Sequence, residues 1–157
     1  MVIELNKIKI ISGGQSGVDR AALDFSIANN LMCGGYCPKG RLAEDGRIED
    51  KYPLLETITE DYNERTIKNV EISDALLVIH KSPIDKGTML AIDEARKLQK
   101  EIFILKISDF DLEELISWLD KTKPSSLNIA GPRESNDEGI YLLTIKVLQQ
   151  LLDKTKL

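Results

Sequence analysis

The sequence contains few cysteine and histidine residues, and this scarcity excludes several kinds of site. Cys33 and Cys37 are its two cysteines, and His80 is its one histidine. A tetrahedral zinc site takes about four ligands, and the two cysteines are too widely spaced for a C-x-x-C redox motif. We therefore expect no structural metal and two free thiols, as in the reducing cytoplasm.

The sequence also lacks long apolar runs and an excess of positive charge. No segment approaches the ~20 apolar residues of a membrane-spanning helix, and the N-terminal residues contain no apolar run of secretory length. The 21 Lys and Arg residues stand against 26 Asp and Glu residues, a net charge of -5. A basic field supplies most of the affinity for nucleic acids and anionic membranes, so we expect neither as a partner. We expect a cytoplasmic location.

The excess acidity is concentrated in one segment that contains no Lys or Arg. Its members are Asp109, Asp111, Glu113, Glu114 and Asp120. These acids equal the net charge, so the rest of the chain is neutral. A local cluster of backbone N–H groups and cations can therefore still bind a small anion elsewhere.

What the sequence does contain is a regular alternation of short apolar runs and helical patterns. Runs rich in Ile, Val and Leu predict strands at residues 8–12, 32–36, 75–79, 102–106 and 127–130. Apolar residues at helical spacing predict helices at residues 18–30, 61–72, 88–100, 111–121 and 139–154. This alternation predicts an α/β fold, a Rossmann-like three-layer sandwich with a mostly parallel sheet. The absence of repeats and linkers predicts one ligand-binding domain over residues 1–157.

Ligands of such sheets bind at the carboxyl ends of the strands, so the loops after the strands are the candidate site. The first loop contains Gly13, Gly14 and Gly17. These glycines would let backbone N–H groups approach an anion, and the following helix adds the positive end of its dipole. The polar side chains of this loop are Gln15, Ser16 and Arg20. The alternative is a tight strand-to-helix turn, and the spacing differs from the dinucleotide motif G-x-G-x-x-G, so we do not expect NAD.

The second loop carries two cations close together. Lys39 and Arg41 lie on either side of Gly40, and we expect Glu44 and Asp45 to pair with Arg41. Placed beside the first loop, the two cations would complement a phosphate.

The third loop ends in Gly87 and Thr88 at the start of a predicted helix. This is a second junction that favours anions, where Thr88 would either cap the helix or contact the ligand. Cys37, just before Pro38, would be either a thiol that faces the ligand or, as we favour, a small buried residue.

With these loops, the sequence resembles the molybdenum carrier, or molybdenum cofactor carrier, family. This family is a branch of the Rossmann-like superfamily that includes the cytokinin-activating "lonely guy" nucleotide-binding proteins. The matching segments are ISGGQSGVDRAALD (11–24), GGYCPKGRLAEDG (34–46), YPLLETITEDYNERTIKNVEISDALLVI (52–79), KGTMLAIDEA (86–95) and LNIAGPRESNDEGIY (127–141). They span most of the chain in the family's order. The sequence departs from the pattern at Ser16, Tyr36 and Lys86, where threonine, tryptophan and glycine are usual.

The resemblance implies a homo-oligomer, a dimer or tetramer, that binds the molybdenum cofactor and protects it or hands it on. This molybdopterin cargo carries a terminal phosphate and a dithiolene-bound oxo-molybdenum, two anionic groups that would suit the glycine-rich loops and their cations. Asp19, Arg65 and Arg133 also lie in the matching segments and are further candidates for the site. For Arg133 and its neighbour Glu134, the alternative is an Arg–Glu bridge that holds the loops.

The main alternative function is hydrolysis. The "lonely guy" relatives are nucleoside-monophosphate N-glycosidases with a motif similar to G-G-x-G-T-x-x-E, whose glutamate serves cleavage of the ribosyl bond. Here Ala91 stands at the glutamate position. Without that carboxylate we expect a binding protein rather than an enzyme, with a nucleotide-ligand sensor as a third alternative.

Overall fold

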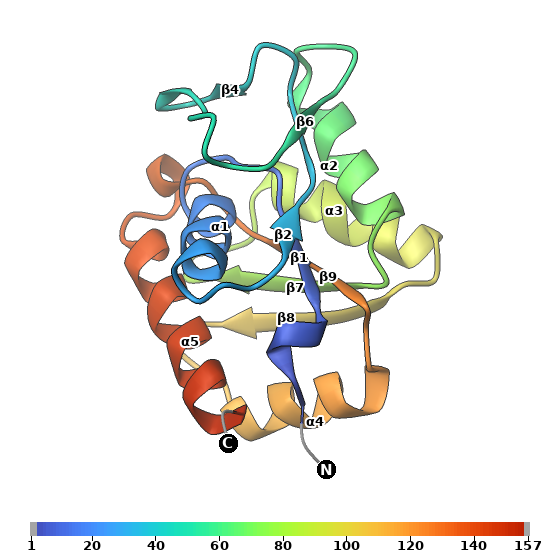
Figure 1. The fold of residues 1–157 in the computed structure, drawn as a ribbon, viewed down its shortest axis with the longest axis vertical. Helices are drawn as coiled ribbons and strands as arrows, with labels where there is room; N and C mark the ends of the chain where they lie inside the picture. Colours follow the sequence, from blue (N-terminus) through green and yellow to red (C-terminus); the bar gives the residue numbers. More distant parts are fainter. Residues whose placement is uncertain (1–2, 156–157) are drawn as a thin grey trace.

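The centre of the fold is a five-stranded sheet whose strands all run parallel. In the computed structural model, which describes residues 3–155, the strand order is β2-β1-β9-β7-β8 (Figure 1). The strands are β1 (Lys9–Ile11), β2 (Cys33–Gly34), β7 (Ala75–His80), β8 (Glu101–Lys106) and β9 (Ser126–Ala130). All five predicted strands are present, and the Rossmann-like α/β layout is confirmed.

Five helices cover the two faces of this sheet. They are α1 (Val18–Ala28), α2 (Tyr62–Glu71), α3 (Lys86–Lys97), α4 (Leu112–Thr122) and α5 (Ile140–Thr155). Helices α1, α4 and α5 pack on one face and α2 and α3 on the other, which makes three layers (Figure 1). Each predicted helix is present, and its ends differ from the prediction by at most three residues.

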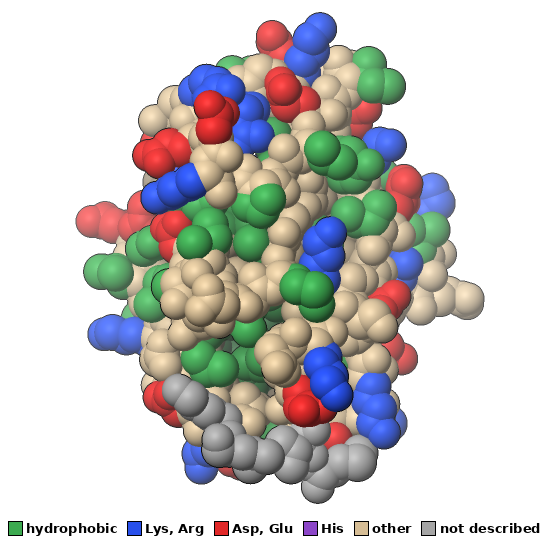
Figure 2. Space-filling view, in the orientation of Figure 1, with side chains coloured by type: hydrophobic (Ala, Val, Ile, Leu, Met, Phe, Trp, Pro, Cys, Tyr) green, Lys and Arg blue, Asp and Glu red, His purple; other side chains and the backbone are tan. Residues whose placement is uncertain are grey.

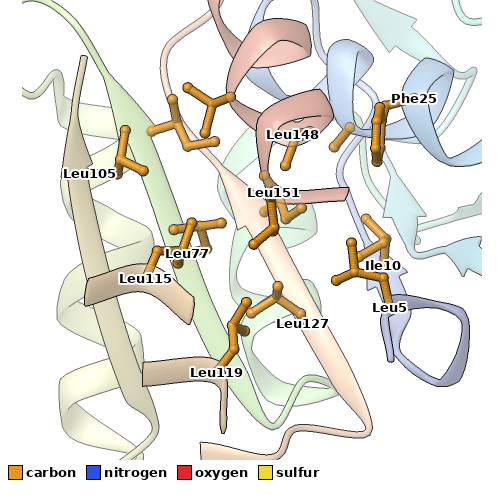
Figure 3. Packing of buried hydrophobic residues seen from close by; sticks show 14 of the residues in the cluster. Leu5, Ile10, Phe25, Leu77, Leu105, Leu115, Leu119, Leu127, Leu148 and Leu151 are labelled. Carbon is orange, nitrogen blue, oxygen red and sulfur yellow. The ribbon is translucent and has the colours of Figure 1, made fainter. Parts of the chain in front are cut away.

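Strand β7 contributes to both apolar layers because successive side chains of a strand point to opposite faces. Leu77 and Ile79 belong to the larger core, under α1, α4 and α5, whereas Leu76 and Val78 pack under α2 and α3. Figure 3 shows strand leucines of the larger core meeting leucines of α4 and α5: Leu77, Leu105, Leu127, Leu115, Leu119, Leu148 and Leu151. Burial on both faces explains why the strand reads as an unbroken apolar run.

Several short elements were not predicted. Two two-stranded sheets pair β3 (Tyr36–Cys37) with β6 (Leu55–Glu56), and β4 (Leu42–Ala43) with β5 (Gly46–Arg47). Short 3₁₀ helices form η1 (Leu5–Lys7) and η2 (Glu134–Asn136). The single strand predicted at 32–36 is divided at Gly35, whose φ is 133°. A Cβ atom at Gly35 would lie 2.3 Å from the carbonyl oxygen of Ser12, so the point where the chain passes from β2 into a second sheet needs glycine.

Both cysteines are free thiols, as expected. Cys37 is fully buried in a third apolar cluster with Leu23, Ile48 and Leu54, which supports its interpretation as a small buried residue. Burial raises the pKa of both cysteine thiols.

Two further observations concern the helices and the surface. Within residues 3–155, no helix is long and apolar enough to cross a membrane. On the face shown in Figure 2, basic and acidic side chains are interspersed along the rim rather than gathered into one basic patch.

Candidate functional site

A cleft lies at the carboxyl ends of the central strands. The loops after β1, β7 and β9 meet there beside α2, because β9 lies between β1 and β7 in the sheet. The cleft has a volume of about 430 Å³, which is within the usual range for small-molecule sites. Its lining comprises Gly13, Gln15, Asp19, Tyr62, Asn63, Arg65, Thr66, Asn69, Asp85, Lys86, Gly87, Thr88, Ala91, Asn128, Ala130, Gly131, Arg133 and Asn136.

The N-terminus of α3 forms one wall of the cleft. Asp85 caps this helix: its carboxylate accepts a hydrogen bond of 2.9 Å from the backbone N–H of Thr88. The side chain of Thr88 is therefore not the cap. The first N–H groups of a helix have no acceptor within the helix, and its dipole makes this end positive. Because Lys86, Gly87 and Thr88 all line the cleft, this wall favours an anion.

Two side-chain atoms at the cleft are buried without a hydrogen-bond partner. Within residues 3–155, three side-chain nitrogen or oxygen atoms are completely enclosed and have no hydrogen-bond partner: Thr88 Oγ1, Arg133 Nε and Thr144 Oγ1. Thr88 and Arg133 both line the cleft, whereas Thr144 lies in α5. Buried polar groups are nearly always hydrogen-bonded, so the two atoms at the cleft indicate a place where a ligand could supply the partners.

A buried ion pair joins the first loop to α2. Arg65 Nη1 lies 3.5 Å from Asp19 Oδ2 and donates to the carbonyl oxygen of Gly13 over 3.1 Å. Burial raises the pKa of Asp19 to about 6, although the charge of Arg65 and the N–H of Gln15 act in the opposite direction. The pair holds the first loop against the helix and brings a titratable carboxyl into the cleft.

Positive charge exceeds negative charge among the residues that line the cleft. The cations are Arg65, Lys86 and Arg133, and the carboxylates are Asp19 and Asp85. Burial alone raises the pKa of Asp85, but hydrogen bonds from Thr88 and Asn136 and the charge of Arg133 hold that pKa below its ordinary value. Asp85 is therefore ionised at neutral pH. Arg65 and Arg133 have the ion-pair partners Asp19 and Glu44, and Lys86 is the lining cation that makes no ion pair within residues 3–155.

The structure brings only part of the predicted site together. The predicted residues that line the cleft are Gly13, Gln15, Asp19, Arg65, Gly87, Thr88 and Arg133. The predicted residues outside its lining are Gly14, Ser16, Gly17, Arg20, Lys39, Gly40 and Arg41. A contact between the ligand and this second group stays a prediction.

Two of the three predicted cations outside the lining are engaged by the protein itself. Arg20 donates to the carbonyl oxygen of Gly14 and binds the carboxylate of Asp45 through two hydrogen bonds of 2.9 and 3.1 Å. Arg41 is 8% exposed, and its guanidinium donates to the carbonyl oxygens of Ile48, Glu49, Tyr52 and Leu54. Lys39, in contrast, is exposed.

The expected pairing of Arg41 with Glu44 and Asp45 is wrong. Asp45 binds Arg20, and the ion-pair partner of Arg41 is Asp50, at 3.8 Å. Glu44 accepts hydrogen bonds from the hydroxyl groups of Ser16 and Ser135. The reason is that Arg41 turns inward beneath residues 48–54 and leaves both acids on the outside of the loop.

An Arg–Glu bridge does hold the loops, but Glu134 is not its acid. Arg133 Nε lies 3.5 Å from a carboxylate oxygen of Glu44. The carboxylate of Glu134 instead accepts from the backbone N–H groups of Gly139 and Tyr141, at the start of α5. The bridge therefore joins the second loop to the segment after β9.

Two glycines of the first loop are required by packing against the protein. Gly14 and Gly17 have positive φ angles of 78° and 81°. A Cβ atom at Gly17 would lie 2.5 Å from the carbonyl oxygen of Pro132, and one at Gly14 would lie 2.6 Å from Leu54 Cδ1. The turn therefore needs these glycines whether or not a ligand binds.

Sequence reasoning missed several residues of the cleft, and some carried a signal. Asp85 precedes Thr88 by three residues, a spacing typical of a helix cap. Asn128 is a polar residue within a run predicted to be a buried strand, which is unusual without a partner. Tyr62, Asn63 and Asn69 carried no such signal, because helical spacing does not show which polar face of a helix meets a cleft.

Comparisons with known proteins agree on one family. The model described as "Circularly permutated YpsA SLOG family" matches residues 10–152. Among solved structures, the chain is similar to a crystal structure from Syntrophus aciditrophicus SB named "Putative molybdenum carrier protein". The two are 42% identical with a TM-score of 0.90, and the match covers 95% of this chain and 98% of that one. No curated protein matches the chain.

Proposed function

The chain belongs to the circularly permuted YpsA SLOG family, and we propose that it binds and carries a small anionic ligand in the cleft between α2 and α3. The proposed ligand is a phosphorylated pterin, with the molybdenum cofactor as the cargo, or a nucleotide of similar size. The name of the solved relative, molybdenum carrier protein, favours the pterin.

The observation that carries this proposal is the pair of partnerless polar atoms at the cleft. Thr88 Oγ1 and Arg133 Nε are buried and make no hydrogen bond within residues 3–155, and the nearest acidic group to Arg133 Nε is that of Glu44, an ion-pair contact at 3.5 Å. A phosphate beside the N-terminus of α3 would accept hydrogen bonds from both and would face the positive charge of Lys86. One oxyanion would thus satisfy the groups that the protein leaves unsatisfied.

The side chains available as metal ligands also indicate how a molybdenum cargo would be held. Among residues 3–155, no group of three or more His, Cys, Asp or Glu side chains could hold a metal ion. In the proposed complex the dithiolene of the pterin therefore keeps the metal, and the protein binds the phosphate and the ring. We propose no structural metal.

We propose binding rather than hydrolysis because of what surrounds Ala91. Its methyl group lines the cleft at the position that resembles the hydrolase glutamate, and it is 2% exposed. The two carboxylates of the cleft have other partners: Asp85 caps α3, and Asp19 lies against Arg65. Neither carboxylate that lines the cleft is free to assist departure of a ribosyl group.

The proposed protein works in the cytoplasm as a homo-oligomer. Leu55 and Ile58 are 65% and 81% exposed in the segment that precedes α2, and such apolar side chains suit a contact between copies. Light scattering during size-exclusion chromatography measures the assembly, and a monomer at micromolar concentration would contradict this part of the proposal.

The experiment is purification from cells that make the molybdenum cofactor, followed by measurement of bound molybdenum and of pterin fluorescence after oxidation. The wild-type protein should retain both. Thr88→Val removes a partnerless hydroxyl at the cleft and should reduce the retained pterin about tenfold, because a hydrogen bond to a charged ligand contributes about 1.5–3 kcal/mol. The matched control is Thr144→Val, which removes a partnerless hydroxyl outside the cleft and should leave retention unchanged. A wild-type protein that retains neither pterin nor molybdenum would contradict the cofactor assignment.

A further inference from the structure

Five carboxamide side chains line the cleft, and one of them differs from the rest. They are Gln15, Asn63, Asn69, Asn128 and Asn136. Asn128 is 2% exposed, yet its side chain makes no hydrogen bond within residues 3–155. A carboxamide buried this deeply nearly always has partners.

The other buried carboxamides are already used by the protein. Asn69 accepts from the N–H of Tyr36 over 2.8 Å and donates to its carbonyl oxygen over 3.0 Å. The oxygen of Gln15 accepts from the N–H groups of Ser16 and Glu44. These two side chains therefore hold loops in place.

The remaining two lie nearer to solvent. Asn136 is exposed and donates to the carboxylate of Asp85 over 3.0 Å, and Asn63 is exposed on α2. Asn128 is the buried carboxamide whose oxygen and nitrogen both lack a partner within residues 3–155, whereas in Gln15 only the nitrogen does.

The position of Asn128 in the sheet explains its depth. It lies in the middle of β9, in register with Ile11 of β1 and Leu76 of β7. Its neighbours Leu127 and Ile129 point to the larger core, so the Asn128 side chain points to the face that α2 and α3 cover. Asn128 therefore belongs to the floor of the cleft, whereas Lys86 and Gly87 are exposed at its mouth.

The floor around Asn128 leaves room for a flat group. Ala91 of α3 and Ala130 of β9 line the cleft with methyl groups only, and Gly131 has no side chain. A Cβ atom at Gly131 would lie 2.2 Å from the carbonyl oxygen of Ile79, so the close approach of these strands needs glycine.

We propose that Asn128 is a specificity-determining residue that reads the ring edge of the bound ligand. A carboxamide offers one acceptor and two donors side by side, and it pairs with a heterocycle that presents a donor next to an acceptor, as pterins and purines do. The ring lies on the floor of the cleft with its edge at Asn128, and the phosphate stays near the N-terminus of α3. This assignment rests on the proposed function of the same cleft.

The test compares ligands with and without a ring in calorimetric titrations. The probes are a pterin monophosphate, GMP and AMP, with ribose 5-phosphate as the ligand that lacks a ring. Asn128→Leu should weaken binding of the preferred ring-bearing phosphate about tenfold to a hundredfold, the effect of losing one bidentate pair. It should change the affinity for ribose 5-phosphate less than twofold. The preferred ring, pterin or purine, is the one whose affinity falls most.

Two further variants keep the test decisive. Asn128→Asp preserves the size of the side chain but replaces its donors with a charged acceptor, so it should also weaken ring binding selectively. Asn6→Leu, at an exposed position of η1, is the matched control and should change no affinity. Without ligand, Asn128→Leu should unfold at a higher temperature than the wild type, because it removes a buried carboxamide without partners.

The failures of this inference and of the proposed function are distinguishable. If the wild type binds a ring-bearing phosphate and both Asn128 variants bind it equally well, the role of Asn128 is wrong and the cleft remains a binding site. If the wild type binds none of the probes, the proposed function fails and the role of Asn128 with it. A lower unfolding temperature for Asn128→Leu would show that Asn128 has partners in the protein, and would also overturn the inference.

Discussion

Replacing Arg41 should destabilise the protein strongly, because its guanidinium organises a loop. The side chain is 8% exposed and donates four hydrogen bonds of 2.7–3.1 Å to the carbonyl oxygens of Ile48, Glu49, Tyr52 and Leu54. Arg41→Met keeps the apolar stem and removes every donor. Each of the four carbonyl groups then loses a charged donor, although those of Glu49 and Tyr52 keep backbone donors.

The magnitude follows from these four contacts. Hydrogen bonds that involve a charged group contribute about 1.5–3 kcal/mol each, but the four share one guanidinium and are not additive. Water can reach carbonyl groups near the surface once the guanidinium is gone, so we expect a loss of about 3–5 kcal/mol. Since domains of this size are stable by about 5–15 kcal/mol, the variant should be near the threshold of folding.

Urea unfolding followed by circular dichroism measures this loss. Arg41→Lys keeps the charge but cannot reach four carbonyl groups, so it should lose less than Arg41→Met and serves if the latter does not fold. Lys39→Met, at the neighbouring exposed cation, is the control and should leave the free energy of unfolding unchanged. If Arg41→Met is as stable as the wild type and loses only ligand affinity, the reasoning is refuted and Arg41 serves the ligand.

Two further predictions concern the cleft and its supports. Because the pKa of Asp19 is about 6 in the fold and about 4 in unfolded chains, its ionisation should remove up to about 3 kcal/mol of stability as the pH rises from 4 to 7. Asp19→Asn should therefore gain stability relative to the wild type over this range in urea titrations, and a difference that does not vary with pH would contradict the assignment. Gly131→Ala should lower the unfolding temperature markedly, since its Cβ atom would overlap backbone and the side chain of Val18, at a cost of about 1–3 kcal/mol or more. Gly87→Ala, whose Cβ atom meets nothing within 4 Å, is its control in α3, and equal unfolding temperatures for the two variants would contradict the packing argument.

The layers of the fold could be predicted because each buried strand and each amphipathic helix has its own periodicity. β7 reads as a continuous apolar run and α2 as a helix whose polar residues recur on one side, so both were identified. The two small sheets have strands of two residues each, and such short segments have no period to detect. Glycine is needed at Gly35, where the second strand divides, because of the carbonyl of Ser12, a contact that only the folded chain creates.

The site was harder to predict because the sequence does not show which way a charged side chain points or which contact makes a loop need glycine. Arg41 and Lys39 are two residues apart, yet one turns inward to carbonyl groups and the other is exposed. Gly17 is required by the backbone of Pro132, far away in the sequence. Whether a polar side chain such as Asn128 finds a partner depends on which helix covers its strand, and no local pattern contains that information.

The most direct test of the proposed function is the electron density of a crystal of this protein soaked with a pterin monophosphate. The proposal predicts density in the cleft between α2 and α3, with the phosphate within hydrogen-bond distance of Thr88 Oγ1 and Arg133 Nε and the ring edge at Asn128. Density for the ligand at another place on the surface, with this cleft holding only water, would contradict it.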